Sequence, residues 1–217
     1  MKVKLIRHTC EPEMLAGYAA AKCYNGKDPR KSLEVAMDGG HESVLEHAAF
    51  TFEVDEVSRV LLAQITRHRL ASFSVQSQRY TGANLNVVCP ESMVCAELVD
   101  DMVEVRRAVD RLYKHARALG VPHEDCRYFT LQGGHTGFVV TMNGRELRHF
   151  FSLRCCERAQ WEIRELADKM LGLAKEVAPA MFADAGPGCV RGKCPEGAKS
   201  CGKPRAATDL SQRNARR

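Results

Sequence analysis

The chain has 217 residues, ten of them cysteine, and a formal net charge of +5 at pH 7. It contains no run near the roughly 18 apolar residues that a membrane-spanning helix needs, and its first ten residues mix charged and apolar types, unlike a signal peptide. We therefore expect a cytoplasmic protein without a membrane segment, whose cysteines are mostly reduced.

The positive charge is concentrated at the C-terminus. Residues 186–217 carry a net charge of +6, which leaves −1 for residues 1–185. A nearly neutral body with local arginines favours discrete anionic ligands over a broad nucleic-acid surface.

The N-terminal quarter predicts a strand and two helices. Residues 2–7 alternate as a half-buried strand does. An Ala-rich helix follows over residues 12–24, because Asn-Gly at 25–26 ends it. Asp28 and the proline after it provide an N-cap and a first turn for a second helix, which stops at the Gly-Gly pair of 39–40.

The next segment predicts a strand, a helix and a loop. Residues 49–54 alternate aromatic and β-branched side chains, which indicates a strand. Residues 56–69 carry apolar side chains at helical spacing, so Gln64 and His68 are expected to share one helix face. Residues 70–80 lack a helical apolar stripe and predict an ordered loop.

The second half is mainly helical. Residues 92–119 predict a long amphipathic helix of about 42 Å, ended by Gly-Val-Pro at 120–122. A short helix carrying Arg127, a strand over 137–142 and a bent helix over 145–175 follow. The expected fold is α+β, with a central antiparallel or mixed sheet packed with helices.

Residues 67–80 are the segment richest in candidate anion-binding groups. Arg67, His68, Arg69 and Arg79 lie among four hydroxyl side chains, with no carboxylate. Planar guanidinium groups beside hydroxyls suit phosphate, which they bind bidentately. From composition alone, a phosphate site and an ordinary basic loop remain equally open.

The spacing in this segment resembles the signature of the flavin-dependent thymidylate synthases. That signature is Arg-His-Arg, seven residues, then Ser-x-Arg. Three further blocks resemble the family in the required order, and the resemblance covers roughly the first 185 residues. The blocks are Gly40-His41-Glu42-Ser43 followed by Glu46-His47 and Phe50-Thr51-Phe52; Asn143-Gly144-Arg145 with His149; and Leu153-Arg154 leading into Ala159-Gln160-Trp161-Glu162-Ile163.

This resemblance implies an FAD-dependent methyltransferase with the family's fold over residues 1–185. The implied reaction is reductive methylation of dUMP to dTMP, with methylenetetrahydrofolate as carbon donor and NADPH as reductant of the flavin. It also implies a homotetramer with sites between subunits. The chain has no Gly-x-Gly-x-x-Gly cradle, so side chains and interfaces would have to hold the dinucleotide.

Arg154 is the catalytic residue that the resemblance implies. A guanidinium facing the N3–carbonyl edge of uracil stabilises negative charge that spreads towards C5. The alternative is a helix-surface arginine that pairs with Glu157 or Glu162.

The resemblance also assigns residues to two ligands. Val75 stands where some family members carry Glu, so only its backbone can contact a ligand. His41 is placed near the flavin and the folate, with a loop histidine that caps the next helix as the alternative. The implied dUMP residues are Gln64, Ile65, Thr66, Arg67, Val75, Gln76, Ser77, Gln78, Arg79, Arg127 and Arg154. The implied FAD residues are Ser43, Arg67, His68, Arg69, Val75, Asn143, Gly144, Arg145 and His149.

Residues 186–217 form a Cys-containing basic extension. Cys189, Cys194 and Cys201 could donate three thiolates to zinc or iron, but the spacing lacks a Cys-x-x-Cys pair. We assign no metal and favour reduced thiols. Residues 203–217 are basic and polar, which predicts disorder.

Two other functions compete with the enzyme. One is a basic nucleic-acid-associated protein that binds through residues 67–80 and the tail, although no nucleic-acid motif supports it. The other is a structural metal protein organised by the tail cysteines. A flavin colour in the purified protein separates the enzyme from both.

Overall fold

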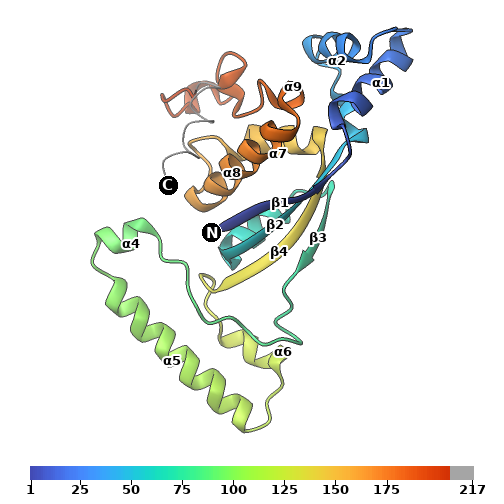
Figure 1. The fold of residues 1–217 in the computed structure, drawn as a ribbon. Helices are drawn as coiled ribbons and strands as arrows, with labels where there is room; N and C mark the ends of the chain where they lie inside the picture. Colours follow the sequence, from blue (N-terminus) through green and yellow to red (C-terminus); the bar gives the residue numbers. More distant parts are fainter. Residues whose placement is uncertain (206–217) are drawn as a thin grey trace. The chain divides into compact units, whose positions relative to one another are not determined.

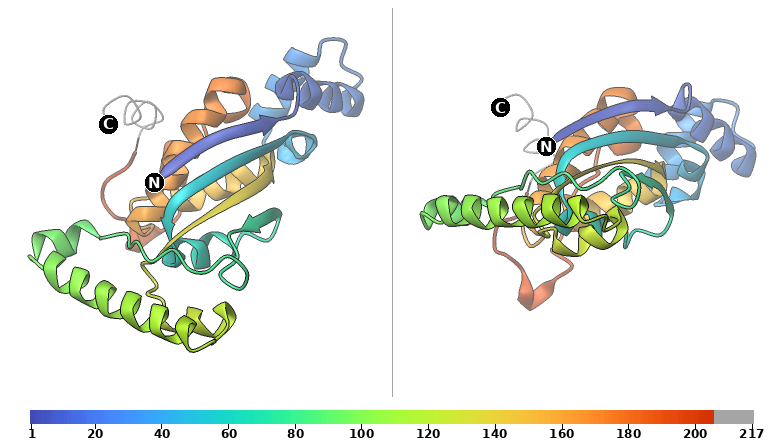
Figure 2. Two further views of the ribbon diagram at one scale, coloured as in Figure 1. Left: turned by 60° about the horizontal axis from the view of Figure 1, so that its bottom comes forward. Right: turned by 90° about the horizontal axis from the view of Figure 1, so that it is seen from below.

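The structure is a computed structural model that describes residues 1–205 (Figure 1). Four strands form one sheet in the order β1-β2-β4-β3. Strands β1, β2 and β4 run side by side in both views of Figure 2. The strands are β1 (Lys2–His8), β2 (Ala49–Ser58), β3 (Ala71–Val75) and β4 (His135–Asn143).

Cross-strand contacts show that the first two strands of the sheet are antiparallel. Lys2 pairs with Glu56 and Lys4 with Glu53, so β1 and β2 run in opposite directions. The expected α+β fold with an antiparallel sheet is therefore confirmed.

The helices are α1 (Pro12–Tyr24), α2 (Pro29–Asp38), η1 (Glu42–His47), α3 (Arg59–Ile65), α4 (Glu91–Cys95), α5 (Val99–Ala118), α6 (His123–Cys126), η2 (Arg127–Phe129), α7 (Gly144–Arg154), α8 (Trp161–Val177), α9 (Pro179–Phe182), η3 (Gly188–Val190) and η4 (Gly197–Lys199).

The chain divides into two compact units, and the division crosses the strands. Unit 1 contains Met1–Lys2, Val54–Arg67 and Ser74–Val139, and unit 2 contains the remainder of the described chain.

Unit 2 is built around an aromatic core. Phe50 of β2, Phe151 of α7 and Phe182 of α9 are fully buried. The Phe182 ring meets Phe50 edge-on at 5.4 Å and Phe151 at 5.9 Å, in the geometry that aromatic pairs prefer. Burial of each such side chain contributes about 1.5–3 kcal/mol, so these contacts fix α7, which carries much of the candidate site.

Unit 1 has a smaller core. Tyr113 and Ala116, near the end of α5, pack with Cys126 of α6. Val105 and Leu112, earlier on the same helix, stay exposed. Helix α5 therefore carries an uncovered apolar side over much of its length.

Several predicted elements are confirmed with their caps. Helix α1 ends at Asn25, which adopts the left-handed conformation that terminates helices. The Asp28 carboxylate accepts a hydrogen bond from the Arg30 amide at 2.9 Å and so caps α2.

The helix predicted over 56–69 is shorter than expected. Residues 56–58 continue β2, and the Ser58 hydroxyl accepts the Leu61 amide at 3.0 Å, so α3 begins at residue 59. The helix ends at residue 65. The expectation that Gln64 and His68 share a helix face is therefore wrong, because His68 lies beyond the helix.

The loop predicted over 70–80 contains a strand. Residues 71–75 form β3 at the edge of the sheet. Their sequence, Ala-Ser-Phe-Ser-Val, alternates apolar and small polar side chains, as a strand does. Five residues are too short for this two-residue period to predict a strand clearly.

Two predicted long helices are interrupted. Helices α4 and α5 replace the single helix over 92–119, because Glu97 adopts a left-handed φ of 58°. The bend expected within 145–175 is a complete break over residues 155–160. The Gln160 side chain accepts the Glu162 amide at 3.1 Å and starts α8 afresh.

Within unit 2, the C-terminal extension packs against α8 at Arg205. This side chain is only 6% exposed and binds the Asp168 carboxylate with both terminal nitrogens, at 3.1 and 2.9 Å. The disorder expected from residue 203 onwards therefore does not hold for Arg205. Residues 206–217 lie outside the described part of the chain, and the domain boundary at 185/186 stays a prediction.

None of the helices described within residues 1–205 is long and apolar enough to cross a membrane.

Candidate active site

One face of α7 gathers the central side chains of the site in unit 2. Glu146, Phe150 and Arg154 are four residues apart and therefore share that face. The His68 ring packs edge-on against Phe150 at 5.0 Å and lies 6.0 Å from the ring of His149. Its Nδ1 is 3.0 Å from a Glu146 oxygen, and Arg154 Nε donates to its Nε2 at 3.2 Å. The structure thus brings three predicted residues together with Glu146, which the sequence did not indicate.

Burial sets the electrostatics of this cluster. His68 is 6% exposed. Its burial lowers its pKa below the ordinary 6.5; the hydrogen bond to Glu146 opposes this effect, and the positive charge of Arg154 reinforces it. Partial burial also lowers the pKa of Arg154, which remains a cation because a guanidinium does not lose its proton in proteins.

Arg154 is not the surface arginine of the alternative interpretation. It forms no ion pair with a carboxylate among residues 1–205. Glu157, one of the suggested partners, binds Arg164 at 3.1 Å instead.

Asn143 and Gly144, at the N-terminus of α7, both have structural roles. The Asn143 side chain caps the helix by accepting the Glu146 amide at 2.9 Å. A Cβ at Gly144 would lie 3.0 Å from the Leu45 carbonyl oxygen, so only glycine fits against η1 without a shift. The helix cap and the close packing explain the Asn-Gly pair at this position. Contact of these two residues with FAD stays a prediction.

Other predicted flavin residues lie at η1 and α7. Arg145 is exposed and binds Glu46 at 2.6 Å, whereas Arg154 donates to His68. Ser43 is exposed on η1. His41 precedes this helix but makes no side-chain cap there, which removes the capping alternative.

Arg67 and Arg69 are exposed, and neither has a carboxylate partner in the part of the chain that the structure describes. Arg67 and Arg69 flank His68 in the sequence, and exposed guanidinium groups are of the type that binds the pyrophosphate of a dinucleotide. The residues present therefore fit a bound FAD.

Two of the predicted dUMP arginines, Arg79 and Arg127, contact the same residue in unit 1. Arg79 Nε lies 2.6 Å from a carboxylate oxygen of Glu124, and Arg127 Nε donates to the Glu124 carbonyl at 3.0 Å. The Arg79 guanidinium also lies over the Tyr80 ring at 5.2 Å. Ser77 accepts the Arg79 amide at 3.2 Å and shapes this turn. Glu124, which holds the pair together, was not among the residues expected.

The remaining predicted dUMP residues differ in what they can offer. Gln64 and Thr66 lie at the end of α3, and Val75 ends β3. Ile65 is fully buried, so only its backbone is available to a ligand. The Gln76 amide already donates to Gly137 at 2.9 Å within the sheet, and Gln78 is buried.

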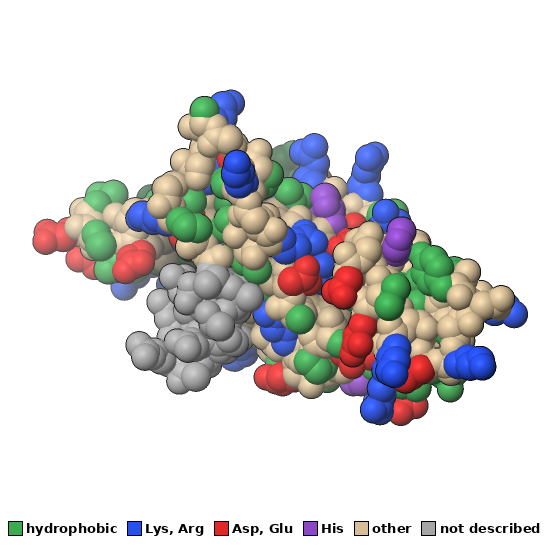
Figure 3. All heavy atoms as spheres, turned by 90° about the horizontal axis from the view of Figure 1, so that it is seen from above, with side chains coloured by type: hydrophobic (Ala, Val, Ile, Leu, Met, Phe, Trp, Pro, Cys, Tyr) green, Lys and Arg blue, Asp and Glu red, His purple; other side chains and the backbone are tan. Residues whose placement is uncertain are grey.

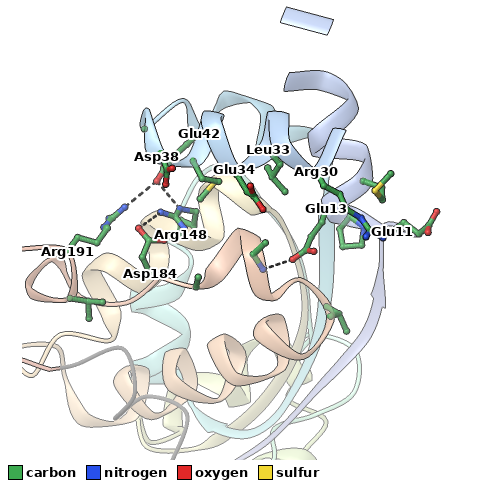
Figure 4. A pocket seen from close by; sticks show the side chains of 18 residues that line it. Glu11, Glu13, Arg30, Leu33, Glu34, Asp38, Glu42, Arg148, Asp184 and Arg191 are labelled. Carbon is green, nitrogen blue, oxygen red and sulfur yellow. Dashed lines mark hydrogen bonds and ion pairs between the residues drawn. The ribbon is translucent and has the colours of Figure 1, made fainter. Parts of the chain in front are cut away.

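A cavity of about 1160 Å³ lies elsewhere in unit 2, between α1, α2 and the end of α9 (Figure 4). Part of its lining is a charge cluster centred on buried Arg148. This residue binds Asp184 at 2.7 Å and Glu42 at 2.8 Å, and Arg191 of the extension also reaches Glu42 at 3.2 Å. The charges of the cluster are paired, so they tie α7 to η1 and the extension.

The tail cysteines show no metal geometry. No group of three or more metal-ligating side chains occurs within residues 1–205. The Cys189 sulfur instead accepts the Arg205 amide at 3.4 Å, and the Cys201 sulfur accepts the Lys203 amide at 3.4 Å.

Comparison with known proteins decides the family. The model of the family described as thymidylate synthase complementing protein matches residues 4–180. A flavin-dependent thymidylate synthase of Geobacter sulfurreducens is 46% identical over 219 residues, with 94% of each chain covered, and one of Clostridium tetani is 40% identical at the same coverage. The chain belongs to the flavin-dependent thymidylate synthase family.

Solved structures agree on the fold of this thymidylate synthase. The UMP/dUMP methylase PolB of Streptomyces cacaoi, bound with 5-Br dUMP, has a TM-score of 0.76 at 20% identity and covers 84% of this chain and 93% of its own. The flavin dependent thymidylate synthase ThyX of Helicobacter pylori, complexed with FAD and dUMP, has a TM-score of 0.70 at 24% identity, covering 86% and 100%.

The nucleic-acid alternative gains no support. Acidic and basic side chains are interspersed on the face drawn in Figure 3, unlike the one-sign surface that binds a phosphate backbone. The family membership points to a nucleotide enzyme instead.

Proposed function

We propose that this flavin-dependent thymidylate synthase converts dUMP to dTMP, with methylenetetrahydrofolate as the carbon donor and NADPH as the source of reducing equivalents. The observation that carries this proposal is Arg154, a cation held by His68 and left without a carboxylate partner in residues 1–205. When bound, FAD supplies the hydride and one-carbon transfer chemistry.

Arg154 would activate the pyrimidine. Its terminal nitrogens face the N3–carbonyl edge in this proposal and stabilise negative charge that reaches C5. Partial burial strengthens that interaction, because less water screens it. The fixed hydrogen bond to His68 means that little reorganisation is needed during the reaction.

Arg79 and Arg127 would hold the phosphate of dUMP, with Ser77 beside them. The Arg79–Glu124 ion pair is about half exposed, and such pairs contribute only about 0–1 kcal/mol. A charge-assisted hydrogen bond to phosphate contributes roughly 1.5–3 kcal/mol. A nucleotide phosphate can therefore displace the Glu124 carboxylate. The other proposed dUMP residues are Gln64, Ile65, Thr66, Arg67, Val75, Gln76, Gln78 and Arg154.

Arg67 and Arg69 would bind the FAD pyrophosphate, since both are exposed and unpaired in the described chain. His41 is proposed to lie near the flavin and the folate. The other proposed FAD residues are Ser43, His68, Val75, Asn143, Gly144, Arg145 and His149.

We further propose that the enzyme is a homotetramer with sites shared between subunits. The exposed Val105 and Leu112 on α5 support this, because an apolar helix side of this kind is normally covered by a partner. The cytoplasmic location stays a prediction.

The direct test is anaerobic incubation of the purified protein with dUMP, methylenetetrahydrofolate and NADPH. We expect a yellow protein whose flavin spectrum is bleached by NADPH, and we expect dTMP as product. A protein that remains colourless after incubation with FAD, or that yields no dTMP while carrying FAD, would contradict the proposal.

A further inference from the structure

The hydrogen bonds around His68 fix which of its ring nitrogens carries the proton. Arg154 Nε is always a donor, so His68 Nε2, 3.2 Å away, must accept and cannot carry a proton. The proton of the neutral ring is then on Nδ1, which donates to the Glu146 carboxylate at 3.0 Å. The three side chains form one directed chain of hydrogen bonds.

We propose that Glu146 is a positioning residue for the reaction: it holds His68 as the Nδ1–H form, and the free Nε2 of that form holds Arg154. This inference rests on the proposed function, because it gives Glu146 a role only if Arg154 acts on the substrate. Glu146 itself does not touch the pyrimidine.

The surroundings of Glu146 support this role. Its side chain is only 5% exposed, as is expected of a carboxylate kept for a specific partner, because burial without a hydrogen bond is costly. Its backbone amide is fixed by the Asn143 cap. His68 is therefore bound by a group that has little freedom to move.

The charges that face His68 make the arrangement dependent on pH. The charged and titratable groups of α7 that act on His68 are Glu146, His149 and Arg154. The residues on either side of His68 in the sequence, Arg67 and Arg69, are exposed to solvent. Protonated His68 would turn an N–H towards Arg154, which breaks their hydrogen bond and brings two cations together. Arg154 is thus held only above the pKa of His68.

Substitutions of Glu146 test the inference through dUMP binding to the FAD-loaded protein. Glu146→Ala should weaken binding about tenfold, the size of coupling that contacting residues show. The same substitution in an Arg154→Ala background should have less than a twofold effect, because Arg154 is no longer there to be positioned. Glu165→Gln, which removes a partly exposed carboxylate paired with Lys169 on α8, is the control and should leave binding unchanged.

Glu146→Gln separates positioning from simple structural support. Its amide oxygen still accepts from Nδ1, so dUMP affinity should be near that of the wild type at pH 8. Loss of the carboxylate charge lowers the pKa of His68, so the acid limb of the dUMP-binding profile should move to lower pH. This variant also keeps the test valid if Glu146→Ala unfolds.

Three results would overturn the inference: equal effects of Glu146→Ala with and without Arg154, full dUMP affinity in Glu146→Ala, or an acid limb that Glu146→Gln does not move. Normal dUMP binding and turnover in Arg154→Ala alone would contradict the role of Arg154 in the proposed function, and the inference with it.

Discussion

Arg154 and His68 are joined by a single hydrogen bond of 3.2 Å, from Nε of the guanidinium to Nε2 of the ring. This bond uses the inner nitrogen of Arg154. The two terminal nitrogens have no hydrogen-bond partner among residues 1–205, so the planar end that binds a carbonyl edge bidentately remains available to a ligand.

His68 makes stability depend on pH. Its folded-state pKa is lowered by burial, so between that value and the unfolded value near 6.5 the unfolded chain binds more protons than the folded chain. The free energy of unfolding therefore rises with pH in this window and falls on acidification through it. Melting temperatures measured between pH 8 and pH 5 should fall more steeply for the wild type than for His68→Gln. Parallel curves would show that His68 does not contribute.

Glu124 competes with the nucleotide phosphate for Arg79. Glu124→Gln removes that competition, and because an exposed pair contributes about 0–1 kcal/mol, dUMP affinity should rise by up to about fivefold. Titration of the FAD-loaded protein with dUMP measures this change. Weaker dUMP binding in Glu124→Gln would mean that its carboxylate organises the site rather than competes within it.

Arg79 should matter for the nucleotide and not for the flavin. Arg79→Ala removes a charge-assisted contact of roughly 1.5–3 kcal/mol, so dUMP binding should weaken by at least tenfold. FAD retention, measured from the flavin absorbance after gel filtration, should not change. Equal losses in both would contradict the division of residues between the two ligands.

Arg205 should contribute to stability. Its guanidinium binds Asp168 with two nitrogens and also the Cys155 carbonyl, all in a buried setting. Arg205→Ala leaves the mostly buried Asp168 carboxylate unpaired, which costs about 3–5 kcal/mol of unfolding free energy. Denaturant unfolding measures the loss, with exposed Lys203→Ala as the control. A loss below about 1 kcal/mol would show that the tail does not hold unit 2 together.

The family motifs could be recognised from the sequence because they depend on residue type and spacing. Helix caps such as Asp28 were readable for the same reason, since a cap and its helix are neighbours in sequence.

The residues that contact His68 and Arg79 could not be predicted from the sequence. Glu146 is 78 residues from His68, and Glu124 is 45 residues from Arg79, so only the folded chain brings each pair together. The buried position of Arg205 was missed because its basic, polar neighbourhood has the composition of a disordered tail, and its partner Asp168 lies on a distant helix. Local propensity also failed at Glu97, where one left-handed residue divides a strongly amphipathic segment.

The most direct measurement of the central claim is single-turnover formation of dTMP by Arg154→Lys and wild-type protein with equal FAD loading. Lysine keeps the positive charge but has a single ammonium group. It cannot donate to His68 and also present a planar pair of donors to the pyrimidine, as arginine can. The rate should fall by about 10²–10³-fold, as when one preorganised donor to a developing charge is lost, while NADPH still reduces the flavin. A variant that forms dTMP within about threefold of the wild-type rate would contradict the account.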